Sequence, residues 1–96
     1  MPRKRKLTKI ITGRTVMTTT VEPWGVMVLF DDQSSMKIKT AGAGAVSVGG
    51  KVKAVYETKD EFKIEFEDGS IATLRLADPG SSVAVRDKNN VVEYLG

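Results

Sequence analysis

The sequence predicts an all-β domain, a small barrel or sandwich of eight to ten short antiparallel strands. Apolar and polar residues alternate along short segments, turn-forming residues separate these segments at close and regular spacing, and no window has a convincing helical period. One pattern of residues also occurs twice along the 96-residue chain, about 36 residues apart. We therefore expect one domain whose core both copies share, because a copy of this length is below the roughly 40 residues that can bury a core alone.

The two copies align without a gap over most of their length. Residues 24–44 pair with residues 60–80, and five of the 21 pairs are identical, among them Phe30 with Phe66. We expect the copies to be related by a pseudo-two-fold axis, as two half-barrels that close each other's exposed sheet edges. Two fused lobes are the alternative. Either arrangement resembles SH3-like or Tudor-like domains in architecture only, because the sequence carries no motif of those families.

The expected organisation is a basic, flexible tail at residues 1–9 and a single β domain at residues 10–96. Within the domain, the first copy covers about residues 14–50 and the second about residues 51–87, and a closing strand follows at residues 91–95. The glycine-rich segment at the end of the first copy is expected to be a turn and short linker. A strand follows it, in place of the helix whose N-terminus would receive a phosphate.

In the first copy, β-branched residues and alternation mark the strands. The segment TVMTTTV is rich in residues with high β propensity, and acidic, serine and glycine residues form the turns that separate the later strands. The same β propensity suggests a further strand at residues 7–12, before the first copy begins. The strands expected in this half lie at residues 7–12, 15–21, 25–30, 35–41 and 45–48.

The clearest strand of the whole chain belongs to the second copy. In EFKIEFE, residues 61–67, Phe62, Ile64 and Phe66 point to one face and the charged residues point to the other. Gly69 then supplies the positive φ that a tight hairpin turn requires. The strands expected in this half lie at residues 51–57, 61–67, 70–77, 83–85 and 91–95.

Composition excludes several classes of function. The chain has no cysteine and no histidine, so it lacks thiol nucleophiles, cysteine zinc ligands and the commonest acid/base group. The acidic pairs, such as Asp31 with Asp32, have no metal-loop spacing and suit hairpin turns. We therefore expect no enzyme, no cofactor and no metal site. No apolar run approaches the roughly 20 residues that span a bilayer, and no signal peptide is recognisable, so the expected location is the cytoplasm.

The basic residues are concentrated at the N-terminus. The first nine residues carry a charge of +5, whereas the other 87 have ten basic and twelve acidic side chains. Such a cluster can neutralise phosphates without reading sequence, or it can be a solvated terminus. Alternation adds cations on the outward faces of the strands. The candidate nucleic-acid-binding residues are Arg3, Lys4, Arg5, Lys6, Lys9, Lys37, Lys39 and Arg75.

The two copies differ most in their central strands. Met27 and Leu29 occupy outward positions where the second copy has Lys63 and Glu65, so the strand of the first copy is apolar on both faces. Such a strand must be covered twice or must leave an apolar patch. The cover is the segment 7–12, a second copy of the protein or another partner. The candidate interface residues are Met17, Trp24, Met27 and Leu29.

Trp24 lies in a Pro-Trp-Gly turn and has two interpretations. It is either an exposed platform for a base or a partner, or it packs over the end of the core in phase with Val26 and Val28. The sequence thus supports two functions. The first is a non-catalytic binding module that associates with nucleic acid without sequence preference. The second is a protein-interaction module, such as a homodimer, that uses the apolar outer face of the first copy.

Overall fold

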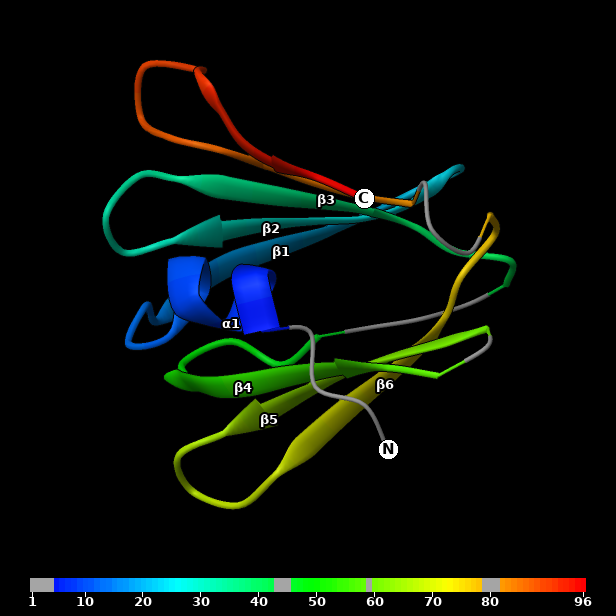
Figure 1. Ribbon diagram of the computed structural model, residues 1–96, viewed down its shortest axis with the longest axis horizontal. Coiled ribbons are helices and arrows are strands. Elements are labelled where there is room, and N and C mark those ends of the chain that lie inside the picture. Colours follow the sequence, from blue (N-terminus) through cyan, green and yellow to red (C-terminus); the bar gives the residue numbers. More distant parts are fainter. Residues whose placement is uncertain (1–4, 43–45, 59, 79–81) are drawn as a thin grey trace.

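The computed structural model consists of two antiparallel β-sheets and one short helix (Figure 1). It describes residues 5–42, 46–58, 60–78 and 82–96, with no description of the Arg5 side chain. Eight strands occur in these ranges, and the all-β class is confirmed. The elements are α1 (Arg5–Ile11), β1 (Val16–Glu22), β2 (Gly25–Phe30), β3 (Ser35–Lys39), β4 (Val52–Glu57), β5 (Glu61–Phe66), β6 (Ile71–Arg75), β7 (Val83–Arg86) and β8 (Val92–Leu95).

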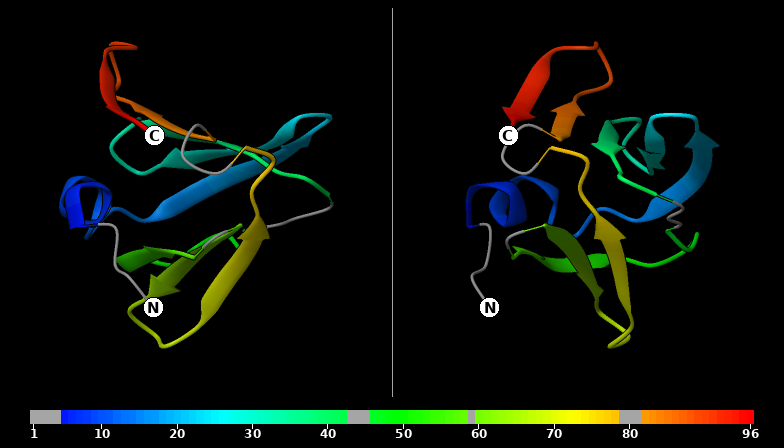
Figure 2. Two further views of the ribbon diagram at one scale, coloured as in Figure 1. Left: turned by 45° about the vertical axis from the view of Figure 1, so that its right-hand side comes forward. Right: turned by 90° about the vertical axis from the view of Figure 1, so that its right-hand side faces the viewer.

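The strands form two layers in place of a closed barrel. One sheet has the order β1-β2-β3-β7-β8 and the other the order β4-β5-β6, and every neighbouring pair is antiparallel. In the described part of the chain, no strand of one layer forms a ladder with a strand of the other, and isolated bridges pair Thr15 with Lys51 and Thr40 with Leu76. The expectation of two half-barrels that close each other is therefore wrong. The two views of Figure 2 show α1 beside the space between the layers.

The strand expected at residues 7–12 is also wrong, because this segment forms α1. Leu7 and Ile11 lie four residues apart, so a helix places both on one face, and both are fully buried. The Thr8 hydroxyl fixes the helix to β4, since it accepts a hydrogen bond from the Val55 N–H at 3.1 Å and donates one to the Val55 carbonyl at 3.3 Å. Residues 5–9, which were expected to be part of a flexible tail, thus belong to the folded domain.

The other expected strands are present with ends shifted by at most two residues, except the one at residues 45–48. Of that segment, Ala45 lies outside the described residues, and residues 46–48 form no strand. Val46 is nevertheless buried and Val48 is exposed. Among residues 46–48, Val46 is therefore the one apolar anchor against the core, and backbone hydrogen bonds of Gly49 and Gly50 with Val16 follow it.

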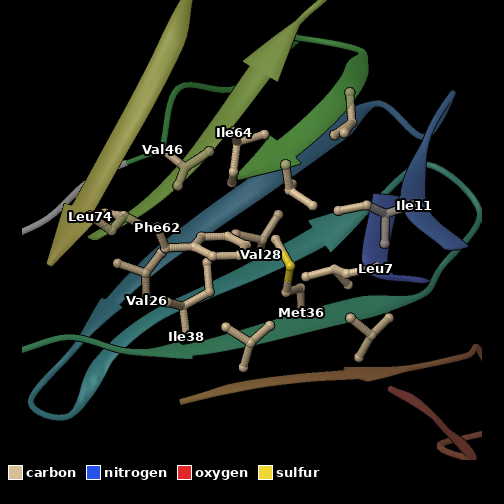
Figure 3. Close-up of a cluster of buried hydrophobic side chains, with 14 of the residues drawn as sticks. Leu7, Ile11, Val26, Val28, Met36, Ile38, Val46, Phe62, Ile64 and Leu74 are labelled. Atoms are coloured by element: carbon tan, nitrogen blue, oxygen red, sulfur yellow. The ribbon is translucent and has the colours of Figure 1, made fainter. Parts of the chain in front are cut away.

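The core lies between the two sheets and is closed at one side by α1 (Figure 3). Alternation along β2, β3 and β5 points every second side chain inward, as the sequence pattern predicts. Each layer and the helix contribute large buried side chains. Those labelled in Figure 3 are Leu7, Ile11, Val26, Val28, Met36, Ile38, Val46, Phe62, Ile64 and Leu74.

The first three strands of the two sheets have matching positions and pairing. β5 begins and ends 36 residues after β2, and β6 begins and ends 36 residues after β3. Val16 pairs with Phe30 and Val52 pairs with Phe66, and in both hairpins the register shifts directly after that pair. The same bulge therefore occurs at the same place in each half.

Candidate functional site

The outer face of the five-stranded sheet carries a row of side chains from four strands. Because Val26, Val28, Met36 and Ile38 fill the core, the residues between them point to solvent. Pairing then sets their order across the sheet: Met27 lies opposite Lys37, Lys37 opposite Ala84, and Ala84 opposite Leu95.

This face is hollowed into an open groove of about 620 Å³. Met27, Ala84 and Leu95 supply its apolar part, and three cations, Lys37, Lys39 and Arg86, line it as well. Ser35 and Asn90 add neutral polar groups. Among the described residues that line the groove there is no acidic side chain. The groove therefore combines apolar surface with three cationic side chains, and Gly96 at the C-terminus lines it as well.

Trp24 lies beside this groove, in the turn between β1 and β2, and is half-buried. The Lys37 Nζ is 4.6 Å from the centroid of its ring, a cation–π geometry that is worth about 0.5–1 kcal/mol at exposed sites. Gly25 fixes the position of the turn, because an added Cβ would lie 2.0 Å from the Ile38 carbonyl oxygen. Trp24 is thus neither a member of the core cluster nor fully exposed.

The predicted cations do not all lie together. Lys37 and Lys39 line the groove, whereas Arg75 lies on β6 of the other sheet, where its guanidinium is 3.5 Å from the Asp60 carboxylate. Arg86 takes the third place in the groove. Sequence reasoning missed Arg86, because only the pairing of β7 with β3 brings it next to Ser35.

The N-terminal cations are separate from the groove. Lys6 and Lys9 are exposed on α1 and are not among the groove residues. Arg3 and Lys4 lie outside the described residues, and the Arg5 side chain is not described. The structure therefore gives two distinct basic regions, one on α1 and one on the outer face of the five-stranded sheet.

The apolar candidates of the first copy are partly uncovered. Met17 is 55% exposed and Leu29 is 42% exposed, while Met27 is half-buried in the groove. The segment 7–12 does not cover them, because Leu7 and Ile11 join the core cluster with the inward residues of β2. Cover by the segment 7–12, the first of the three alternatives, is therefore wrong.

Arg14 organises a polar cluster that sequence reasoning did not find. Its guanidinium donates to both Glu93 carboxylate oxygens, at 3.0 and 3.2 Å, and to the Ser34 hydroxyl at 2.9 Å, and its Nε is 3.1 Å from Asp32 Oδ2. Burial, which raises the pKa of Asp32, is outweighed by the hydrogen bonds from Ser34 and by the charge of Arg14, so this pKa is lowered. The partners are far apart in sequence, so no local pattern reveals them. The cluster has two carboxylates for one guanidinium, and each of these groups has a partner within it, so the cluster is best explained as structural.

Other kinds of site have little support in the described ranges. No group of three or more His, Cys, Asp or Glu side chains is arranged to hold a metal ion among them. The described part of the chain also contains no helix long and apolar enough to cross a membrane. Comparison with models of known protein families, with curated proteins and with solved structures finds no match to this chain. The inference about function therefore depends on the groove itself.

Proposed function

We propose that this protein is a non-catalytic, cytoplasmic binding module that associates with nucleic acid through the groove on the five-stranded sheet. The observation that carries the proposal is the presence of Lys37, Lys39 and Arg86 in one hollow without an acidic side chain among its described lining. Residues 10–96 together have more acidic than basic side chains. The groove is thus a positively charged region on a domain whose net charge is negative. A polyanion gains from such a site by releasing its counterions.

The basic region of α1 adds to this proposal. Lys6 and Lys9, with the cations that precede them, can hold further phosphates. Deletion of residues 1–9 is not a clean test of this contribution, because it would remove the buried Leu7 and open the core. The double substitution of Lys6 and Lys9 by Glu leaves the core intact and tests the same charges.

The first experiment measures the anisotropy of labelled random oligonucleotides at several salt concentrations. We expect micromolar or tighter binding that weakens steeply with salt. Lys39→Glu should weaken it at least about tenfold and reduce the log-log salt slope by about one, because one phosphate is no longer neutralised. The matched variant is Arg75→Glu, because Arg75 occupies the corresponding position on β6 but already faces Asp60.

Two results of this experiment would contradict the proposal. The absence of binding at low salt would remove nucleic acid as a partner. Equal losses of affinity for Lys39→Glu and Arg75→Glu would show that diffuse surface charge, and not the groove, attracts the ligand.

The second candidate function is assembly through the apolar part of the same face. Met17 and Leu29 lie uncovered near the bulge between β1 and β2, where Leu29 pairs with Thr18. A two-fold homodimer would cover this patch on both copies at once. Because Met27 belongs to the patch and also lines the groove, nucleic acid and a second copy would compete for this face.

We also propose that the fold arose by duplication of a segment of about 36 residues and has pseudo-two-fold symmetry. The support is a set of reciprocal hydrogen bonds between the halves. The Val16 N–H donates to the Gly50 carbonyl and the Val52 N–H to the Arg14 carbonyl, both at 2.9 Å. Each donor and acceptor lies 36 residues from its counterpart. Two-fold related units make the same contact twice, with the roles of the two units exchanged, and these two hydrogen bonds have that relation.

A further inference from the structure

We propose that the groove takes single-stranded nucleic acid in preference to duplex, with the sugar-phosphate backbone along β3 and bases against the apolar residues on either side. This inference rests on the proposed function and specifies its ligand. A duplex presents mainly phosphates to a protein surface and hides its base faces in the stack. A single strand exposes both phosphates and bases, so it can use a site that is both cationic and apolar.

The cations follow the direction of β3. Lys39 and Lys37 are two residues apart on that strand, and Arg86 lies opposite Ser35, two residues further along. At about 3.3 Å per residue, this line extends over roughly 13 Å. A nucleic-acid backbone placed along β3 would therefore pass all three cations in turn.

The apolar side chains lie on both sides of this line. Met27 on β2 is opposite Lys37 on one side, and Ala84 on β7 followed by Leu95 on β8 lie on the other. Leu95 is 69% exposed, although it is a large aliphatic residue. Phosphate groups bind to the cations and make no use of the exposed apolar atoms beside them. The faces of unstacked bases would cover these apolar atoms.

Trp24 provides a stacking surface next to the cation line. Its ring lies under the Lys37 ammonium, and the close approach of Gly25 to β3 fixes the turn that carries it. The indole is half-buried, and an aromatic ring can stack on any base, which would give binding without sequence preference.

The test compares a labelled oligo-dT with a duplex of the same length at one salt concentration. We expect the single strand to bind at least about tenfold more tightly, given one or more stacked bases. Trp24→Leu and Leu95→Gln should each weaken single-strand binding several-fold without changing the salt slope, because neither variant alters charge. Ile71→Gln is the matched control, since Ile71 is a 58% exposed aliphatic residue on the edge strand β6.

The outcomes separate this inference from the proposed function. Tighter binding of the single strand, reduced by Leu95→Gln and not by Ile71→Gln, supports it, and Leu95→Gln remains informative if Trp24→Leu fails to fold. Equal binding of single strand and duplex would overturn the inference and leave the proposed function in place. Competition by inorganic polyphosphate as effective as by oligo-dT would also overturn it. No binding of either oligonucleotide at low salt would overturn both.

Discussion

Arg14 shows how one side chain holds together distant parts of this chain. Its partners come from the turn between β2 and β3 and from β8, and its own side chain is only 16% exposed. The guanidinium can satisfy several acceptors at once because its N–H groups form a rigid planar fork. Ser34 completes the cluster by accepting from Arg14 and donating to Asp32. Through Glu93, this cluster adds side-chain hydrogen bonds between β8 and the rest of the structure to the backbone pairing of β7 with β3.

We expect Arg14→Met to lower the free energy of unfolding by about 1–2 kcal/mol at neutral pH, because it removes hydrogen bonds to charged groups while the partners stay partly solvated. The effect should also depend on pH. Asp32 has a lowered pKa in the folded state, so its contribution is present above its ordinary value of 3.8 and is lost as the pH falls through the lowered pKa. The difference between wild type and variant should therefore shrink in acid.

Urea denaturation at neutral pH and at successively lower pH measures this effect. Lys88→Met is a suitable control, because Lys88 is exposed and lines the same small hollow as Arg14. Equal stabilities of the two variants would contradict a structural role for the Arg14 cluster.

At the scale of elements, two glycines have equivalent places in the two halves. Gly13 and Gly49 have φ angles of +88° and +94°, and an added Cβ would meet no atom within 4 Å at either position. The Gly13 N–H donates to the Val52 carbonyl at 2.9 Å, and the Gly49 N–H donates to the Val16 carbonyl at 2.7 Å. Each glycine thus precedes the first strand of one sheet and donates to the first strand of the other.

Gly13→Ala and Gly49→Ala should each lower the free energy of unfolding by about 1 kcal/mol. The reason is that alanine is strained in the left-handed backbone conformation, whereas its Cβ would meet no neighbouring atom. If the two halves arose by duplication, the two variants should lose nearly the same free energy of unfolding. Gly42→Ala is the control: its φ lies outside the left-handed region and the space around it is open, so we expect a change near zero or slightly stabilising. Thermal and urea unfolding measure all three, and clearly unequal costs for the first two variants would contradict equivalent roles.

The helix α1 shows the limit of local patterns at this scale. Ile10, Ile11 and Thr12 are β-branched and favour a strand by propensity, and seven residues are too few for a clear helical period. A strand would place Lys9 on the same face as Leu7 and Ile11, whereas the helix buries Leu7 and Ile11 and leaves Lys9 exposed. Tertiary packing therefore overrides propensity in this segment.

At the scale of the whole molecule, the two candidate functions are separated by Leu29. We expect Leu29→Lys to change stability by no more than about 0.5 kcal/mol, because the side chain lies outside the core. If the protein assembles through this face, the variant should become monomeric in sedimentation or light-scattering measurements. Nucleic-acid binding should not weaken, since the substitution adds a positive charge to the face that carries the groove.

Ile71→Lys serves as the control, because it places the same charge on the outer face of the other sheet. A wild-type protein that is monomeric at high concentration, or an oligomer that Leu29→Lys leaves unchanged, would rule out the assembly proposal. Either result would leave the groove as the main functional surface.

The sequence alone determined the class of the fold, most strand positions and the inward or outward direction of the strand residues. These depend on alternation with period two, which is a local property of residues such as Phe62, Ile64 and Phe66. It also identified Lys37, Lys39 and Met27 as outward residues, although it could not say which of them meet.

Only the tertiary structure decided how these elements combine. The pairing of β7 with β3 brings Arg86 and Leu95 to the face that carries Lys37, and it leaves Arg75 on the other sheet. The same packing turns residues 5–11 into a helix and opens the layers in place of a closed barrel. Strand order, register between distant strands and the burial of a terminal segment depend on contacts between residues far apart in sequence, and no local pattern encodes them.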